Sequence, residues 1–169
     1  MLIVETSRLK LRHIAVHDAT FILALLNDSS FLQYVGDKQV RNLETAKKYI
    51  LEGPVQSYQT NGYGLYLVEL VDTGEPIGIC GVIKRDFLDH ADLGFALMPG
   101  YRGNGYAFES ARATVELARD ELGLVKIVAI TNPDNLYSIK LLEKLGMSFD
   151  KRIELPGNDK QLNLYSYNL

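Results

Sequence analysis

The sequence predicts a mixed α/β fold in which a central βαβ unit lies within a mostly antiparallel sheet flanked by helices. Two observations carry this prediction. Apolar segments of strand length, 93–98 and 126–131, enclose the longest amphipathic helical pattern of the chain, at 106–122. Strand-like segments joined by short turns lie before and after this unit, which is the pattern of hairpins. A right-handed crossover would place strands 93–98 and 126–131 parallel to one another.

The N-terminal segment is expected to form a strand followed by a helix. Charged and apolar side chains alternate over residues 8–14, which is typical of a half-buried strand. Apolar side chains then recur at helical spacing over residues 18–26, with Asp18 near the helix start. The next segment, 31–35, fits neither period and ends at Gly36.

A further helix is expected over residues 43–51, where Asn42 could supply the N-cap. Gly53-Pro54 either breaks this helix or restarts it, because proline cannot continue the helical hydrogen bonds. Residues 63–71 and 77–84 then form a predicted hairpin around a polar turn.

The helix at 106–122 has the clearest pattern in the chain, because its apolar residues form one stripe. The stripe consists of Phe108, Ala111, Val115, Ala118 and Leu122. Gly123 follows as a predicted C-cap. A last helix is expected over 135–145, and a final hairpin is expected from strands 149–155 and 161–167.

Length and composition suit a single domain spanning residues 1–169, with 47% hydrophobic and 23% charged residues. The net charge of −3 gives no general attraction to nucleic acid. The single cysteine, Cys80, excludes an intrachain disulfide and fits a reducing compartment. No apolar run has the length of a membrane span, so a soluble cytoplasmic protein is expected. No cysteine pair or histidine cluster has metal-ligand spacing, so no metal is expected.

A glycine-rich segment between strand 93–98 and helix 106–122 has the features of an anion site. The N–H groups at a helix start lack intrahelical partners, and the helix dipole favours negative charge there. Gly103 and Gly105 allow the backbone to approach a phosphate closely, and Arg102 adds a cation. The segment therefore predicts a phosphate-bearing ligand.

Two common phosphate-binding motifs do not fit this segment. The chain contains no Gly-Lys-Ser/Thr, which excludes a phosphate-binding loop of the NTPase type. A dinucleotide fingerprint would place glycine or alanine where the chain has Phe108. The pattern that fits is R-x-x-G-x-A, formed by Arg102, Gly105 and Ala107. It resembles the pyrophosphate loop of the GNAT superfamily of acyl-CoA-dependent N-acyltransferases.

Other segments resemble the RimJ/RimL subgroup of that superfamily, and together the motifs extend over nearly the whole chain. They are the segment 5–12 with Asp18-Ala19, the segments 81–86 and 92–95, and the segments 132–138 and 141–147. The resemblance implies the GNAT fold, in which the two parallel strands of the βαβ unit splay apart. It also implies acetyl-CoA as the co-substrate.

The resemblance further implies which residues contact acetyl-CoA. They are Phe95, Ala96, Leu97, Arg102, Gly103, Asn104, Gly105, Tyr106, Ala107, Asn135 and Ser138. The glycine-rich loop would hold the pyrophosphate, and strand 95–97 would pair with the pantetheine arm and aim the Leu97 N–H at the thioester oxygen. Asn135 would bind the pantetheine amide and Ser138 would lie near the sulfur. A plain helix cap at Asn135 and a surface hydroxyl at Ser138 are the structural alternatives.

The resemblance identifies the catalytic residues less directly than the residues that contact acetyl-CoA. Many members of the superfamily place a tyrosine, the usual general acid, where this chain has Leu142, and leucine cannot donate a proton. Ser138 is the favoured acid, with water, Tyr137 or no acid at all as alternatives. Asp92 is the favoured base, because relatives often carry an acidic residue at this position.

Other candidates near the predicted site are weaker. Asp86, Asp89 and Asp92 follow one another at intervals of three residues. Together they could attract a cationic amine, or they could form a solvated acidic loop. His90, Glu69 and Glu109 are weaker bases. Cys80 lies in an apolar strand, which favours a buried core residue over a nucleophile.

The sequence therefore predicts an acetyl-CoA-dependent N-acetyltransferase that acts on a primary amine by direct attack in a ternary complex. The resemblance suggests a protein N-terminus, with ribosomal proteins as the precedent. The alternatives are a small amine (polyamine, amino acid or antibiotic) and a non-catalytic CoA-binding module. No nucleic-acid or membrane partner is expected. The acceptor pocket is expected from residues of about 18–60 and 149–169.

Overall fold

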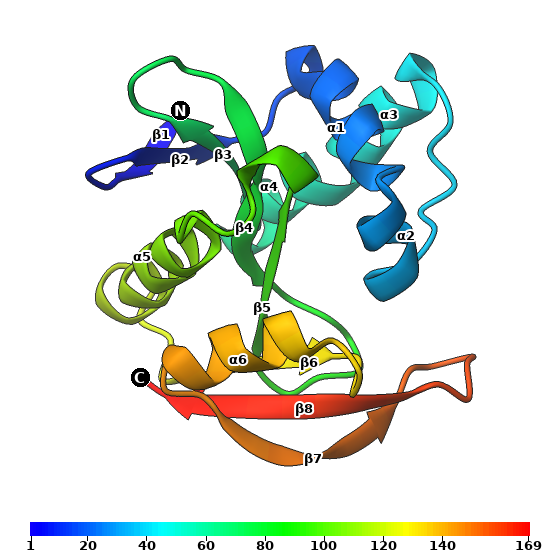
Figure 1. Ribbon diagram of the computed structural model, residues 1–169, viewed down its shortest axis with the longest axis vertical. Helices are drawn as coiled ribbons and strands as arrows, with labels where there is room; N and C mark the ends of the chain where they lie inside the picture. The colour runs from blue at the N-terminus through cyan, green and yellow to red at the C-terminus, as the bar shows by residue number, and fades with distance from the viewer.

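The computed structural model describes residues 1–169 and is built on one eight-stranded sheet with helices on both faces (Figure 1). The strand order is β1-β2-β3-β4-β5-β6-β8-β7. All neighbouring strands are antiparallel except β5 and β6, which are parallel. The strands are β1 (Leu2–Glu5), β2 (Leu9–His13), β3 (Leu65–Leu70), β4 (Pro76–Ile83), β5 (Ala91–Leu97), β6 (Lys126–Thr131), β7 (Ser148–Glu154) and β8 (Gln161–Asn168).

Six α-helices join or cover these strands. They are α1 (Ala19–Leu26), α2 (Ser29–Tyr34), α3 (Leu43–Ile50), α4 (Gln56–Asn61), α5 (Tyr106–Asp120) and α6 (Leu136–Lys144). Short 3₁₀ turns lie at Val16–Asp18 and Pro99–Tyr101, and a π-helical turn at Leu51–Val55 joins α3 to α4. No helix of the chain is both long and apolar enough to cross a membrane.

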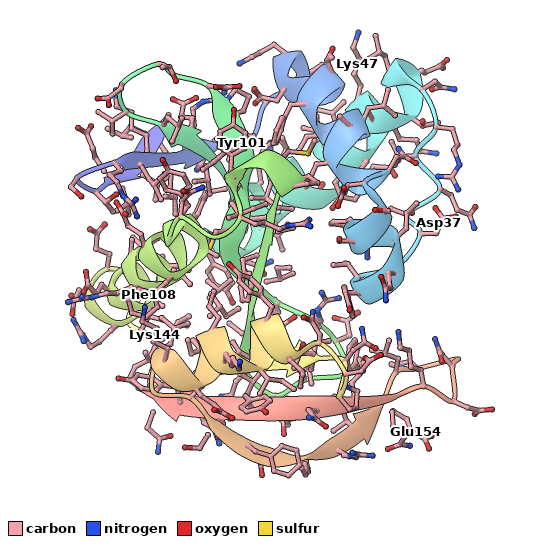
Figure 2. The ribbon with its side chains drawn as sticks, viewed as in Figure 1. Asp37, Lys47, Tyr101, Phe108, Lys144 and Glu154 are labelled. Carbon is pink, nitrogen blue, oxygen red and sulfur yellow. The ribbon has the colours of Figure 1, made fainter.

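Two hydrophobic cores pack against opposite faces of the sheet, because side chains of a strand alternate between its faces. On one face, α5 buries Ala111 and Ala118 against strand residues such as Cys80. On the other face, α1 and α3 pack against Leu67 and Ile79. Helices α5 and α6 also contact one another at the surface, where the Lys144 ammonium lies 4.2 Å from the centre of the Phe108 ring (Figure 2).

The parallel strands β5 and β6 separate soon after they meet, as the GNAT resemblance implied. Their register contains only the pairs Ala91–Ile127 and Asp92–Val128. Beyond Asp92, β5 stays paired with β4 on its other side, while β6 pairs with β8 through Thr131. The edge of β5 that faces β6 is therefore unpaired over residues 93–97. This opening in the sheet positions the candidate site.

The predicted βαβ unit, both hairpins and the N-cap at Asn42 are confirmed, with element ends shifted by a few residues. Strand β1 is an edge strand that the sequence analysis did not predict. The ambiguous segment 31–35 belongs to α2, whose N-cap is Asp28. Asp18 does not cap α1 through its side chain, because its carboxylate is bound by Arg12 at 2.8 and 2.9 Å.

Candidate active site

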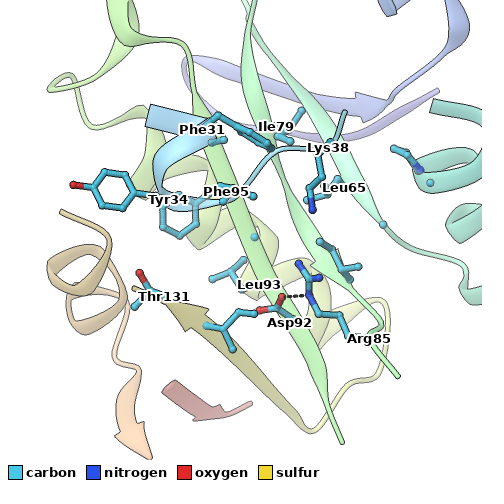
Figure 3. A pocket seen from close by; sticks show the side chains of 18 of the residues that line it. Phe31, Tyr34, Lys38, Leu65, Ile79, Arg85, Asp92, Leu93, Phe95 and Thr131 are labelled. Atoms are coloured by element: carbon cyan, nitrogen blue, oxygen red, sulfur yellow. Dashed lines mark hydrogen bonds and ion pairs between the residues drawn. The ribbon is translucent and has the colours of Figure 1, made fainter. Parts of the chain in front are cut away.

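A cavity of about 900 Å³ occupies the opening between β5 and β6 and extends beneath the N-terminal helices (Figure 3). Its walls come from distant parts of the chain. They include Asp92–Leu97 of β5, Ile130 and Thr131 of β6, Asn135 and Ser138 at the start of α6, Phe31 and Tyr34 of α2, Lys38 after α2, and Tyr49 of α3. Residues of both segments expected to form the acceptor pocket, 18–60 and 149–169, line this cavity, the second segment through Leu155, Lys160 and Leu162.

Backbone groups of β5 point into this cavity. The Met98 N–H donates to the Ile77 carbonyl of β4 at 2.9 Å. Because backbone groups alternate in direction along a strand, the N–H groups of Phe95 and Leu97 point the other way, toward the unpaired edge. The structure thus presents hydrogen-bond donors along the wall of the cavity.

The glycine-rich loop continues this wall toward α5. Gly103 and Gly105 both have φ of +81°, a left-handed conformation that residues with a side chain rarely adopt. The first helical hydrogen bond of α5 runs from the Glu109 N–H to the Gly105 carbonyl at 3.0 Å. The N–H groups from Gly103 to Phe108 donate to no protein acceptor. Such a run of free donors at a helix start suits an anion.

The Arg102 side chain is not a free cation of this loop, in contrast to the sequence-based expectation. Its guanidinium donates to Asp28, Ser30 and the Leu97 carbonyl, each at 3.0 Å. This contact ties the N-terminus of α2 to the end of β5. At the other end of α2, the Asn132 amide donates to the Tyr34 carbonyl at 2.8 Å. Helix α2 is therefore fastened to both sides of the opening.

Arg8 occupies the outer side of the loop. Its guanidinium lies 4.5 Å from the centre of the Tyr106 ring and donates to the Asn104 carbonyl at 2.9 Å. The same guanidinium forms an ion pair with Glu109 at 2.6 Å. Glu109 is therefore a structural anchor for the loop, and it does not line the cavity.

Asn135 and Ser138 lie at the start of α6, where both line the cavity. The Asn135 carbonyl oxygen caps the helix by accepting from the Ser138 N–H at 3.2 Å. Its amide nitrogen and the Ser138 hydroxyl have no hydrogen-bond partner in the protein. The helix-cap alternative for Asn135 is therefore confirmed, and the other end of the same side chain is free for a ligand. Leu142 is 1% exposed and belongs to the core.

Asp92 lies at the fork where β5 and β6 separate. It is 2% exposed, and its Oδ2 accepts from Arg85 Nε at 2.7 Å (Figure 3). Its Oδ1 is buried without a partner. Burial raises the pKa of Asp92 from 3.8 to about 6, against the opposing effect of Arg85. A carboxyl group with that pKa is mostly ionised at neutral pH and can accept a proton.

The structure does not bring the other acidic candidates to this point. Asp86 lines the mouth of the cavity, but Asp89 and His90 line a separate, smaller one. Glu69 is bound to Arg12 at 3.1 Å. Asp92 is therefore the only one of these candidates that is buried at the fork. No group of three or more His, Cys, Asp or Glu side chains has the arrangement of a metal site.

The cavity is also lined by Lys38, Tyr49 and Arg85, none of which was predicted from the sequence. Lys38 and Arg85 point toward one another in Figure 3. No local motif marks these residues, because they lie on separate segments that only the tertiary fold brings together. Arg85 had one signal, its position within the family-like segment 81–86.

Comparison with known proteins agrees with the fold and the motifs. The family model described as the acetyltransferase (GNAT) domain matches residues 8–148. The uncharacterized N-acetyltransferase YoaA of Bacillus subtilis (strain 168) is 32% identical over 145 residues, which cover 85% of this chain and 81% of that protein.

Solved structures show the same architecture. The acetyltransferase from Agrobacterium tumefaciens str. C58 has a TM-score of 0.83 at 26% identity, covering 98% of this chain and 94% of that one. A second similar structure is RimL, a ribosomal L7/L12 alpha-N-protein acetyltransferase in complex with coenzyme A. It has a TM-score of 0.83 at 20% identity, and the match covers 100% of this chain and 98% of the RimL chain. The second likeness is one of fold alone.

Proposed function

The chain belongs to the GNAT acetyltransferase family, and on that premise we propose that it transfers the acetyl group of acetyl-CoA to a primary amine by direct attack in a ternary complex. One observation carries the proposal. The unpaired edge of β5 leads directly into the free N–H groups of the glycine-rich loop. A ligand that combines an amide-bearing arm with a diphosphate, as CoA does, matches both parts of this path.

The two parts would hold acetyl-CoA as follows. The N–H groups of Gly103, Asn104, Gly105, Tyr106 and Ala107 bind the diphosphate. Residues Phe95, Ala96 and Leu97 line the pantetheine arm, and the Asn135 amide nitrogen binds one of its carbonyl groups. Arg102 contributes mainly by holding Leu97 and α2 in place, because Asp28 already binds its side chain.

The reaction needs a neutral amine, a stabilised oxyanion and a departing thiolate. We assign proton acceptance from the ammonium, through water, to Asp92. The amine nitrogen then attacks the thioester carbon, and the Leu97 N–H stabilises the oxyanion that forms. The C–N bond is complete when the C–S bond breaks. Ser138 donates a proton to the leaving sulfur, whose thiol has an ordinary pKa of about 8.5, and regains one through water from the proton that the nitrogen loses as it becomes an amide. Leu142 lies too deep in the core to take part.

The acceptor is a primary amine. The resemblance to RimJ/RimL proteins makes a protein N-terminus the first candidate, and RimL is named for that activity. The Lys38 and Arg85 side chains within the cavity instead favour the other candidate, a small amine that carries an anionic group of its own. The only cysteine, Cys80, is buried and unpaired, which supports a reducing compartment such as the cytoplasm.

The proposal is tested by following thiol release from acetyl-CoA by the full chain with a panel of peptides, polyamines and amino acids. Steady release that requires an amine, with mass spectrometry showing an acetylated product, would support it. Binding of acetyl-CoA without release for any amine would identify a non-catalytic CoA-binding module. Binding of NAD or ATP in place of acetyl-CoA would overturn the assignment of the glycine-rich loop.

A further inference from the structure

Three hydrogen-bond donors on the acceptor side of the cavity have no acceptor in the protein. Arg85 uses only its Nε, toward Asp92, so both terminal nitrogens of the guanidinium are free. No salt bridge or hydrogen bond involves the Lys38 ammonium, and none involves the Tyr49 hydroxyl. All three side chains line the cavity.

These donors form a positive region. Figure 3 shows the Lys38 ammonium directed toward the Arg85 guanidinium across the cavity. Desolvation and the charge of Arg85 lower the pKa of Lys38, and the charge of Arg85 also counteracts the rise in the pKa of Tyr49 that burial causes. Asp92 pairs with Arg85, whereas the Lys38 ammonium forms no ion pair with any carboxylate. An unpaired ammonium directed toward a second cationic side chain favours binding of an anion.

Resting on the proposed function, we propose that the acetyl acceptor is a small amine that carries its own carboxylate, as an amino acid does. The carboxylate binds between the terminal nitrogens of Arg85 and the Lys38 ammonium, with the Tyr49 hydroxyl as a third donor. This arrangement leaves the amine of the same molecule close to Asp92, because Arg85 contacts both carboxylates. Charge recognition thereby fixes the orientation of the nucleophile.

Glu52 and Asp86 also line the cavity and are exposed, without an ion pair. These two carboxylates would suit an acceptor with a second positive charge, such as a polyamine. The decisive comparison is therefore between acceptors whose second group is positive and acceptors whose second group is negative. The carboxylate is favoured because the Lys38 ammonium is directed toward Arg85 and forms no ion pair with an acid. The Arg85 guanidinium contacts Asp92, where the reacting amine must be.

The test compares each amino acid with its carboxamide as acceptor for the full chain at saturating acetyl-CoA. The acid should have a kcat/KM about tenfold or more above that of the amide, since a hydrogen bond between charged groups contributes that much. Lys38→Gln should raise KM for the acid by a similar factor and reduce the preference for the acid over the amide, with KM for acetyl-CoA unchanged. Lys47→Gln is the matched control, because Lys47 lies on α3 outside the cavity (Figure 2).

Equal or better use of carboxamides, of spermidine or of amino-terminal peptides by the wild-type chain would overturn the carboxylate proposal while leaving acetyl transfer intact. A binding experiment tests the carboxylate site independently of acetyl transfer. N-acetyl amino acids, titrated into the protein loaded with CoA, should bind more tightly than their amides, and Lys38→Gln should reduce the difference in affinity. That result without thiol release for any amine would retain the carboxylate site and refute the proposed activity.

Discussion

Substitution of Gly105 probes the proposed diphosphate site with a charge. Gly105 is the N-cap of α5 at φ +81°, and a Cβ added there would lie 3.3 Å from the end of the flexible Arg8 side chain. Gly105→Glu and Gly105→Gln therefore have the same backbone strain and nearly the same size. They differ in one negative charge beside the free N–H groups. The difference in acetyl-CoA affinity between the two variants isolates that charge.

The size of the effect follows from Coulomb's law. A carboxylate about 6 Å from one phosphate charge is repelled by about 1.4 kcal/mol at an effective dielectric constant of about 40. Two phosphate charges give about 3 kcal/mol, and neighbouring Arg8 and salt reduce this to about 2 kcal/mol. The Glu variant should thus bind acetyl-CoA about 30-fold more weakly than the Gln variant.

Isothermal titration calorimetry at low and moderate salt measures this difference, with circular dichroism to establish that both variants fold. Both should lose about 1–2 kcal/mol of stability from the left-handed backbone. The affinity gap should narrow as salt rises. Equal affinities of the Glu and Gln variants, at every salt concentration, would show that the diphosphate does not bind at this loop.

Three further substitutions, at Asp92, Ser138 and Leu142, test the roles assigned to these residues. Asp92→Asn should lower kcat with little change in acetyl-CoA affinity, and it should remove the rise in wild-type kcat through an apparent pKa near 6. The pKa of Asp92 in the folded protein exceeds the ordinary 3.8, so the free energy of unfolding of the wild type should fall by at most about 3 kcal/mol as the pH rises from 4 to 6. Denaturation of the Asn variant across the same pH range should not show this fall. Ser138→Ala should reduce kcat by about tenfold and leave Kd for acetyl-CoA unchanged; an unaltered rate would exclude Ser138 as donor. Leu142→Tyr should cost about 1–3 kcal/mol in chemical denaturation through overpacking, without raising kcat.

The sequence was most informative where local patterns determine structure. The stripe of apolar residues that includes Ala111 and Ala118 predicted α5, and strand 126–131 was predicted with its observed bounds. The glycines at 103 and 105 predicted a loop with left-handed backbone and free N–H groups. These features depend on residues within one helix, one strand or one turn.

Features that depend on tertiary contacts were not predictable in the same way. The short helix α2 buries only Phe31, so it has no helical stripe of its own. Its position depends on Asp28 meeting Arg102, 74 residues further along the chain. For the same reason the sequence analysis assigned Arg102 to the ligand, whereas the structure shows its side chain bound to Asp28. Lys38 and Arg85 likewise meet only in the folded chain.

A crystal structure of the protein with bound acetyl-CoA tests the central claim most directly. The account predicts diphosphate oxygens within hydrogen-bond distance of the N–H groups of Gly103 to Ala107. It also predicts the pantetheine arm along the unpaired edge of β5, with the acetyl carbonyl at the Leu97 N–H. Acetyl-CoA bound elsewhere, with this edge and the glycine-rich loop unoccupied, would contradict the account.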